Sequence, residues 1–129
     1  MQNLTKFEYA VLEKLLRGDH PILVELYGQL STCNVRDREM SGIGFFTYLK
    51  VPSELKKTNI NLRFGDVIAE IPELKNGAGF VLYVKNGKLE MLEGYCYDES
   101  WPNEISTFKL MYITGKTRDL TALEKSLKQ

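Results

Sequence analysis

The feature that most constrains the fold of this chain is a two-residue turn, Asn86-Gly87, between two runs in which apolar and polar residues alternate. Asn-Gly is the preferred sequence of a type I′ turn, whose twist matches that of the strands it joins. The stretch GFVLYVKNGKLEMLEGY therefore predicts an antiparallel β-hairpin.

If the strands pair without interruption beyond this turn, their register predicts which side chains of the hairpin face the core. Residues paired across the hairpin share a face, because side chains alternate along each strand. The pairs expected on the more apolar face are Val84 with Leu89, Leu82 with Met91 and Phe80 with Glu93. A core-facing Glu93 has two interpretations: it holds the strand end through hydrogen bonds, or it is a carboxylate of raised pKa in a small pocket.

Two helices are predicted before the hairpin. Residues 4–17 show an apolar helical stripe and a capping box that opens with Thr5. A second helix follows after a short link, with Asp19 or His20 as its cap and Pro21 in its first turn.

Further strands and a closing helix complete the pattern. Strands are predicted over 42–51, 64–71 and 106–113, with a surface loop over 52–62 and a short helix over 119–129. The chain is therefore expected to form one α+β domain, residues 1–129. Its two N-terminal helices pack on one face of a mostly antiparallel sheet of four to six strands, and the short C-terminal helix closes the domain.

Charge and hydropathy exclude several partners. The 17 basic and 17 acidic side chains give a net charge of zero at pH 7, which argues against direct capture of nucleic acid by a basic surface. No segment approaches the roughly 20 apolar residues of a membrane-spanning helix, and the first residues lack the apolar core of a signal peptide. We expect a cytoplasmic protein that does not act at a membrane.

Motifs of common chemistries are missing from the sequence. One histidine, His20, and two separate cysteines, Cys33 and Cys96, make a zinc site of Cys and His nearly impossible. Residues 34–40, NVRDREM, predict a solvated edge with mutual ion pairs, or else an arginine for anion binding. We predict no catalytic residue, no metal and no cofactor. The alternative is a housekeeping protein with a small-molecule pocket, or a hydrolase that uses carboxylates such as Glu93.

The segment after the hairpin is dense in aromatic and acidic residues. Pro102 favours an extended backbone at Trp101, which indicates a loop. Aromatic side chains give contact area and carboxylates steer a basic partner, so this segment is predicted to bind a protein. The predicted contact residues are Tyr95, Tyr97, Asp98, Glu99, Trp101 and Glu104. In the alternative, Trp101 folds back to cap the open end of the sheet and the acids are merely solvated.

The blocks MSGIGFFTYL and GAGFVLYVKNGKLEMLEGYCYDESWP, in this order, resemble a family of small bacterial proteins of unassigned function. Members share an N-terminal helical segment, a GxGFF strand and a block that ends MLEGYxYxExWP. Such proteins are similar to the immunity proteins encoded beside polymorphic toxins, including those of contact-dependent growth inhibition. The resemblance implies a non-catalytic protein that binds a cognate toxin, such as a nuclease, and blocks its active site. We expect a monomer or a weak homodimer paired through an exposed edge strand.

Overall fold

The computed structural model describes residues 2–55 and 57–128. Met1, Lys56 and Gln129, which the predicted domain, loop and closing helix include, lie outside the described residues. The helices are α1 (Lys6–Leu15), α2 (Pro21–Gln29), the 3-10 helix η1 (Leu30–Thr32) and α3 (Leu120–Leu127). The strands are β1 (Asn34–Met40), β2 (Gly44–Lys50), β3 (Leu62–Phe64), β4 (Val67–Ile71), β5 (Leu74–Lys85), β6 (Lys88–Cys96) and β7 (Lys109–Tyr112).

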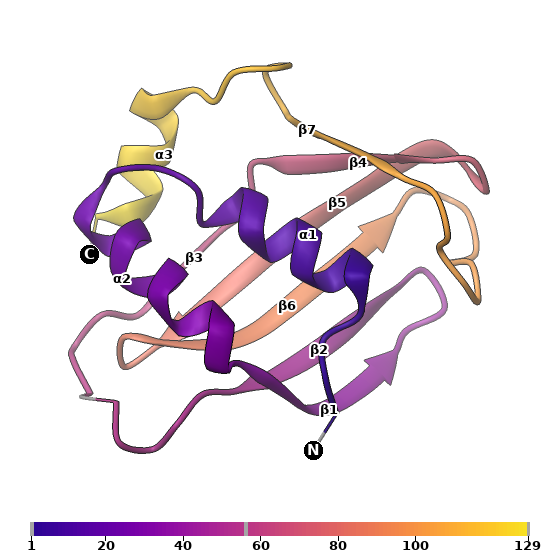
Figure 1. The fold of residues 1–129 in the computed structure, drawn as a ribbon. Coiled ribbons are helices and arrows are strands. Elements are labelled where there is room, and N and C mark those ends of the chain that lie inside the picture. The colour runs from indigo at the N-terminus through magenta and orange to yellow at the C-terminus, as the bar shows by residue number, and fades with distance from the viewer. Residues whose placement is uncertain (1, 56, 129) are drawn as a thin grey trace.

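The strands form one antiparallel sheet in the order β1-β2-β6-β5-β4-β7, and β3 pairs with β5. Helices α1, α2 and α3 lie on the same side of this sheet (Figure 1). The predicted α+β fold is therefore confirmed, although the sheet has seven strands. The prediction had missed β1 and had joined β3 and β4, which are separated at Gly65 and Asp66. None of the described helices combines the length and apolar character that crossing a membrane requires.

The local signals at the helix starts are confirmed. The Thr5 hydroxyl accepts a hydrogen bond from the Glu8 N–H at 3.0 Å, and the Glu8 carboxylate accepts one from the Thr5 N–H at 2.8 Å. This reciprocal capping box opens α1. At α2 the cap is His20, whose Nδ1 accepts a hydrogen bond from the Ile22 N–H.

The hairpin turn is confirmed, but the predicted register beyond it is wrong. Asn86 and Gly87 both have positive φ, as a type I′ turn requires. Val84 pairs with Leu89 as expected; then a β-bulge at Glu90 shifts the pairing by one residue. Beyond the bulge the pairs are Tyr83 with Met91, Leu82 with Leu92, Val81 with Glu93 and Phe80 with Gly94.

The bulge reverses the face on which each later residue of β6 lies, because a one-residue slip moves every side chain to the other face. Leu92 is fully buried in the core, and Glu93 points to the side of the sheet without helices. The predicted core-facing position of Glu93 is therefore wrong. The exchange buries a leucine in place of a carboxylate, which is the favourable choice.

The core lies between the helices and the sheet. Apolar faces of α1, α2 and α3 pack there on the buried positions of the strands. Gln29 joins α2 to the hairpin, since its Nε2 donates to the Gly87 carbonyl at 2.8 Å and its Oε1 accepts from the Leu89 N–H at 3.0 Å. The hairpin thus has a fixed position beneath the helices.

Strand β1 forms one edge of the sheet, and its charges make contacts other than those predicted. Arg36 lies over the Tyr48 ring at 5.3 Å and reaches Glu90 at 3.8 Å. Arg38 turns to the helix side and pairs with Glu8. The predicted solvated edge is thus present, but these arginines pair with distant carboxylates. Charged side chains on an edge strand hinder pairing with another chain.

Two buried ionic networks connect distant parts of the chain. Glu8 of α1 accepts hydrogen bonds from Arg38 Nε at 2.9 Å and Nη2 at 2.7 Å, and from the Thr47 hydroxyl at 2.6 Å. Near the C-terminus, Arg118 makes a forked contact with Asp66, at 2.7 and 3.1 Å. Neither network was predicted, because its members are far apart in sequence.

Arg118 also satisfies the C-terminal end of α1. Its Nη2 donates to the carbonyl of Leu15 at 2.7 Å, and its Nη1 donates to that of Arg17 at 2.7 Å. The last carbonyls of a helix have no partner within the helix, so these bonds replace water. The guanidinium carbon lies 4.6 Å from the centre of the Tyr112 ring.

Candidate protein-binding site

The structure places the predicted contact residues Tyr95 and Tyr97 together. The Tyr95 ring lies across Gly79 of the neighbouring strand, where an added Cβ would be 2.6 Å from the ring. Tyr97 packs edge-on against Tyr95, with ring centroids 5.7 Å apart. Both belong to the side of the sheet that carries no helix, and Tyr97 is 47% exposed.

Trp101 lies on the opposite side of the sheet. Its ring packs against Phe45 at 5.2 Å and Phe7 at 6.3 Å between centroids, and its backbone N–H donates to the Gly42 carbonyl. The indole is partly buried and packs on the core. This matches the alternative in which Trp101 folds back. Glu104 borders the same region and is exposed.

The other predicted carboxylates lie in the turn between these two sites. Glu99 accepts hydrogen bonds from the backbone N–H groups of Lys75 at 2.9 Å and Asn76 at 3.1 Å, so it fastens the turn to β5. Asp98 is exposed and adopts a positive φ of 53°. The predicted contact residues therefore do not form one surface.

A broader surface is the side of the sheet away from the helices, which we call the open face. Half-buried side chains occupy it at alternate strand positions, whereas their neighbours in sequence belong to the core. Strand pairing sets them in rows. Its apolar and aromatic members are Phe46, Tyr48, Ile68, Val81, Tyr83, Met91, Tyr95 and Met111.

Glu93 lies near the centre of the open face. Phe46 and Val81 are its partners on the two adjacent strands. One carboxylate oxygen accepts a hydrogen bond from the Tyr83 hydroxyl at 3.0 Å. Burial raises the pKa of Tyr83, and this bond to Glu93 raises it further. Among the described residues, no Lys or Arg nitrogen lies within 4 Å of the Glu93 carboxylate.

Charged groups of both signs border the open face. Tyr48 donates its hydroxyl hydrogen to Glu39 at 2.9 Å, which raises the pKa of Tyr48. The carboxylates are Asp37, Glu39, Glu70, Glu90 and Glu93, and the basic side chains are Arg36, Lys50, Arg63, Lys85, Lys88 and Lys109.

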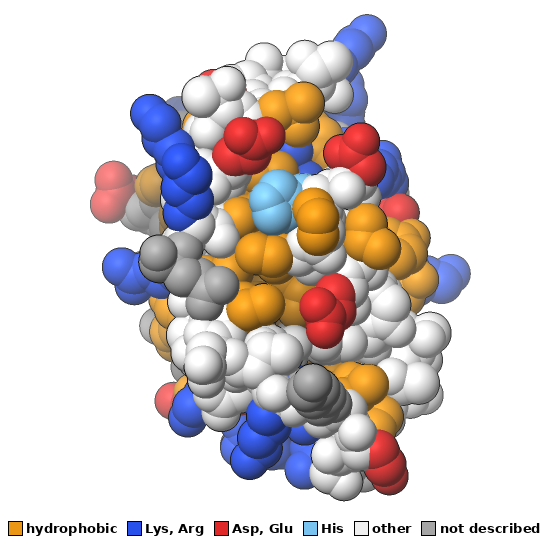
Figure 2. All heavy atoms as spheres, turned by 90° about the vertical axis from the view of Figure 1, so that its left-hand side faces the viewer, with side chains coloured by type: hydrophobic (Ala, Val, Ile, Leu, Met, Phe, Trp, Pro, Cys, Tyr) orange, Lys and Arg blue, Asp and Glu red, His pale blue; other side chains and the backbone are white. Residues whose placement is uncertain are grey.

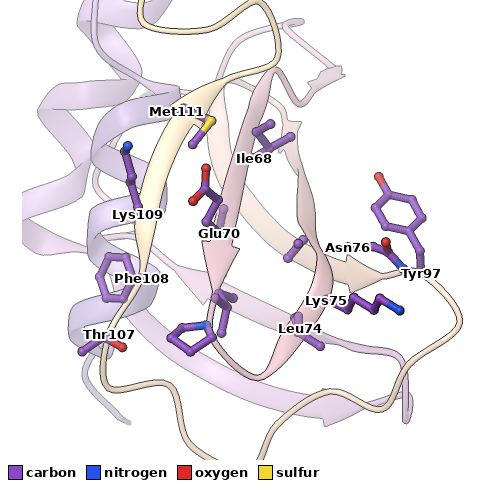
Figure 3. A pocket seen from close by; sticks show the side chains of 15 residues that line it. Ile68, Glu70, Leu74, Lys75, Asn76, Tyr97, Thr107, Phe108, Lys109 and Met111 are labelled. Atoms are coloured by element: carbon purple, nitrogen blue, oxygen red, sulfur yellow. The ribbon is translucent and has the colours of Figure 1, made fainter.

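Two hollows are candidate small-molecule sites. The larger, of about 800 Å³, follows the β4–β5 hairpin. Figure 3 shows its lining on both sides of the hairpin, with Tyr97 on one side and Phe108 on the other, so it is an open depression. The second, of about 400 Å³, lies beside Trp101 and Glu8. Glu93 lines neither hollow, so these hollows do not support the pocket interpretation of this carboxylate.

A separate apolar area lies over α2 and α3. Figure 2 shows hydrophobic side chains in the middle of this side of the molecule, with charged ones around them. Exposed apolar residues of these helices include Val24 and Leu120. Scattered exposed apolar residues are normal on soluble proteins, and this area has no charge pattern that identifies a partner.

The two cysteine thiols are buried. Burial raises the pKa of the Cys33 thiol to about 11 and also raises that of Cys96. A protonated thiol is a poor nucleophile. The Cys96 sulfur lies 3.2 Å from the Ile43 carbonyl and 3.3 Å from that of Glu99. Within residues 2–55 and 57–128, no cluster of three or more Cys, His, Asp or Glu side chains suits a metal.

Most of the open face was not predicted from the sequence. The sequence feature that indicates this face is the alternation in GFFTYLK. There Phe46 and Tyr48 point to the opposite side of the strand from the core residues Phe45, Thr47 and Leu49. Both sets are hydrophobic enough to be buried. The open face can therefore be identified only from the structure, which shows which side of the sheet the helices cover.

Comparison of the chain with known protein families, with curated proteins and with solved structures found no match. The resemblance to small bacterial proteins therefore stays a prediction. The function has to be inferred from the site itself, because a fold alone does not define a function.

Proposed function

We propose that this chain is a non-catalytic binding protein that docks on a protein partner through its open face. The partner we propose is a bacterial toxin, which the chain neutralises in the cytoplasm as an immunity protein. It would act by covering the surface that the toxin needs for its own substrate. The open face is the observation that carries this proposal.

The composition of the open face supports a protein partner. An antiparallel sheet with one solvated face usually carries polar residues there. Here Phe46, Val81 and Met91 occupy central positions, and Tyr48, Tyr83 and Tyr95 surround them. Aromatic residues and methionine are enriched in protein interfaces. A surface on which apolar and aromatic side chains gather in this way is typical of a binding site.

The charges suggest which kind of toxin would fit. A nuclease grips phosphates with lysine and arginine side chains. Carboxylates of the open face, such as Glu39 and Glu93, would pair with these basic groups, because opposite charges speed and orient docking. A nuclease toxin with a basic substrate cleft is therefore the partner that we propose.

Growth assays test this proposal. A toxin-like reading frame beside this gene should arrest growth when expressed alone, and coexpression of this chain should restore it. The two purified proteins should also form a complex in calorimetry. A neighbouring product that neither arrests growth nor binds this chain would contradict the immunity role.

Two exposed tyrosines provide a matched test of the binding surface. Tyr97 beside the open face is 47% exposed and Tyr9 on α1 is 45% exposed. Tyr97→Ala should weaken toxin binding about tenfold or more, as loss of an aromatic interface residue does. Tyr9→Ala should leave the dissociation constant unchanged. Equal effects of the two substitutions would place the interface elsewhere.

A further inference from the structure

We propose that Glu93 receives an arginine or lysine side chain of the protein partner at the centre of the open face. The inference rests on the proposed function, since it specifies how that surface recognises a toxin. It identifies one carboxylate as the anchor, where the proposed function required only a broad surface.

Apolar and aromatic groups frame the carboxylate of Glu93. Phe46 and Val81 flank it across the sheet, and Met91 and Tyr95 are its same-face neighbours along β6. The Tyr83 hydroxyl donates to Oε1 at 3.0 Å. Hydrogen bonds to the second oxygen, Oε2, are absent among the described residues. Oε2 of Glu93 is therefore available to accept a hydrogen bond from a donor of another molecule.

Several other carboxylates of the chain already have an arginine. Glu8 pairs with Arg38 and Asp66 with Arg118, each at 2.7 Å. Glu93 lacks such a partner among the described residues, although two arginines border the open face. Arg36 lies over Tyr48 and reaches Glu90, and Arg63 lies opposite Tyr83 in the strand pairing.

A docked partner would remove water from this position. A carboxylate that loses its water must gain a charged or hydrogen-bonding partner, or else it opposes binding. A cation satisfies this need, and the rings around Glu93 attract a cation by their faces. Arginine suits the site best, because its planar fork pairs with a carboxylate and stacks on aromatic rings.

Calorimetry with the toxin domain tests this recognition. Glu93→Gln keeps the size of the side chain and removes its charge, so binding should weaken on the order of tenfold to a hundredfold. The loss should shrink at high salt, where charges are screened. Glu25→Gln is the matched control and should leave the affinity unchanged, because Glu25 is an exposed glutamate of α2, on the helix side of the sheet. Equal affinity for wild type and Glu93→Gln would overturn the inference while the proposed function stands.

A probe that needs no toxin separates the two proposals. N-acetyl-arginine amide should shift the NMR signals of the Phe46, Glu93 and Tyr95 amides, and its neutral citrulline analogue should not. Glu93→Gln should abolish the difference, and thermal unfolding should confirm that this variant is folded. Signals that respond equally to both compounds would overturn the inference. A selective response without any toxin binding would support recognition of a cation and refute the immunity role.

Discussion

Replacing Glu8 by alanine is expected to lower the free energy of unfolding by about 3 kcal/mol, a large share of the stability of a small domain. Glu8 is 4% exposed and accepts hydrogen bonds from Arg38, Thr47 and the Thr5 N–H. Alanine removes all of these acceptors. It leaves the fully buried Thr47 hydroxyl without its partner and breaks the capping box. Urea unfolding followed by circular dichroism measures the loss.

Glu13 offers the control for Glu8, since it is a glutamate of the same helix. It pairs with Arg17 one turn later, at the surface. Exposed pairs of this kind contribute well under about 1 kcal/mol, so Glu13→Ala should change stability little. Equal losses in the two variants would show that the buried position of Glu8 is unimportant.

The same carboxylate should make stability depend on pH. Burial would raise the pKa of Glu8, but hydrogen bonds from Arg38, Thr47 and Thr5 outweigh it and hold the pKa below the ordinary value of 4.5. A lowered folded-state pKa stabilises the fold fully above the unfolded value and loses this effect as pH falls through the folded value. The stability difference between wild type and Glu8→Gln should therefore be constant above pH 4.5 and shrink below it.

Arg118→Ala is expected to lower the free energy of unfolding by about 3 kcal/mol, because it removes a buried arginine from its ion pair with Asp66, whose side chain is 26% exposed. The Arg118 side chain is 6% exposed and bonds Asp66 together with the carbonyls at the end of α1. Alanine would leave Asp66 unpaired and those carbonyls without donors. Thermal and urea unfolding should both show the loss.

Two further variants define what Arg118 contributes. Arg118→Lys keeps the charge but lacks the planar fork that reaches Asp66 and three carbonyls at once, so it should recover only part of the stability. Lys116→Ala alters an exposed residue nearby and should be near neutral. Full stability in Arg118→Ala would refute the role given to this network.

Short-range signals predicted much of the fold. The Thr5 capping box, the His20 cap and the Asn86-Gly87 turn each depend on residues a few positions apart, and each is present. The alternation of apolar and polar residues within the strands also predicted that helices cover one side of a mostly antiparallel sheet, as the structure has it. Helix caps and tight turns form between residues that are close together in sequence, so they can be predicted from the sequence alone.

Long-range choices were harder to predict. The bulge at Glu90 moves Leu92 into the core and Glu93 out of it, and only burial of the whole sheet decides between the two registers. Pairs such as Glu8 with Arg38 join residues 30 positions apart. The composition of the loop around Trp101 led to its prediction as the contact site. The open face, by contrast, is formed by residues of several strands that are distant in sequence.

The position of Trp101 on the helix side of the sheet makes its fluorescence an intrinsic probe of folding. The single indole packs on Phe7 and Phe45 beneath the helix layer, with the sheet between it and the open face. Its fluorescence therefore follows the integrity of the helix layer. A ligand arriving on the far surface contributes no direct quenching, so folding and docking can be monitored separately in one sample.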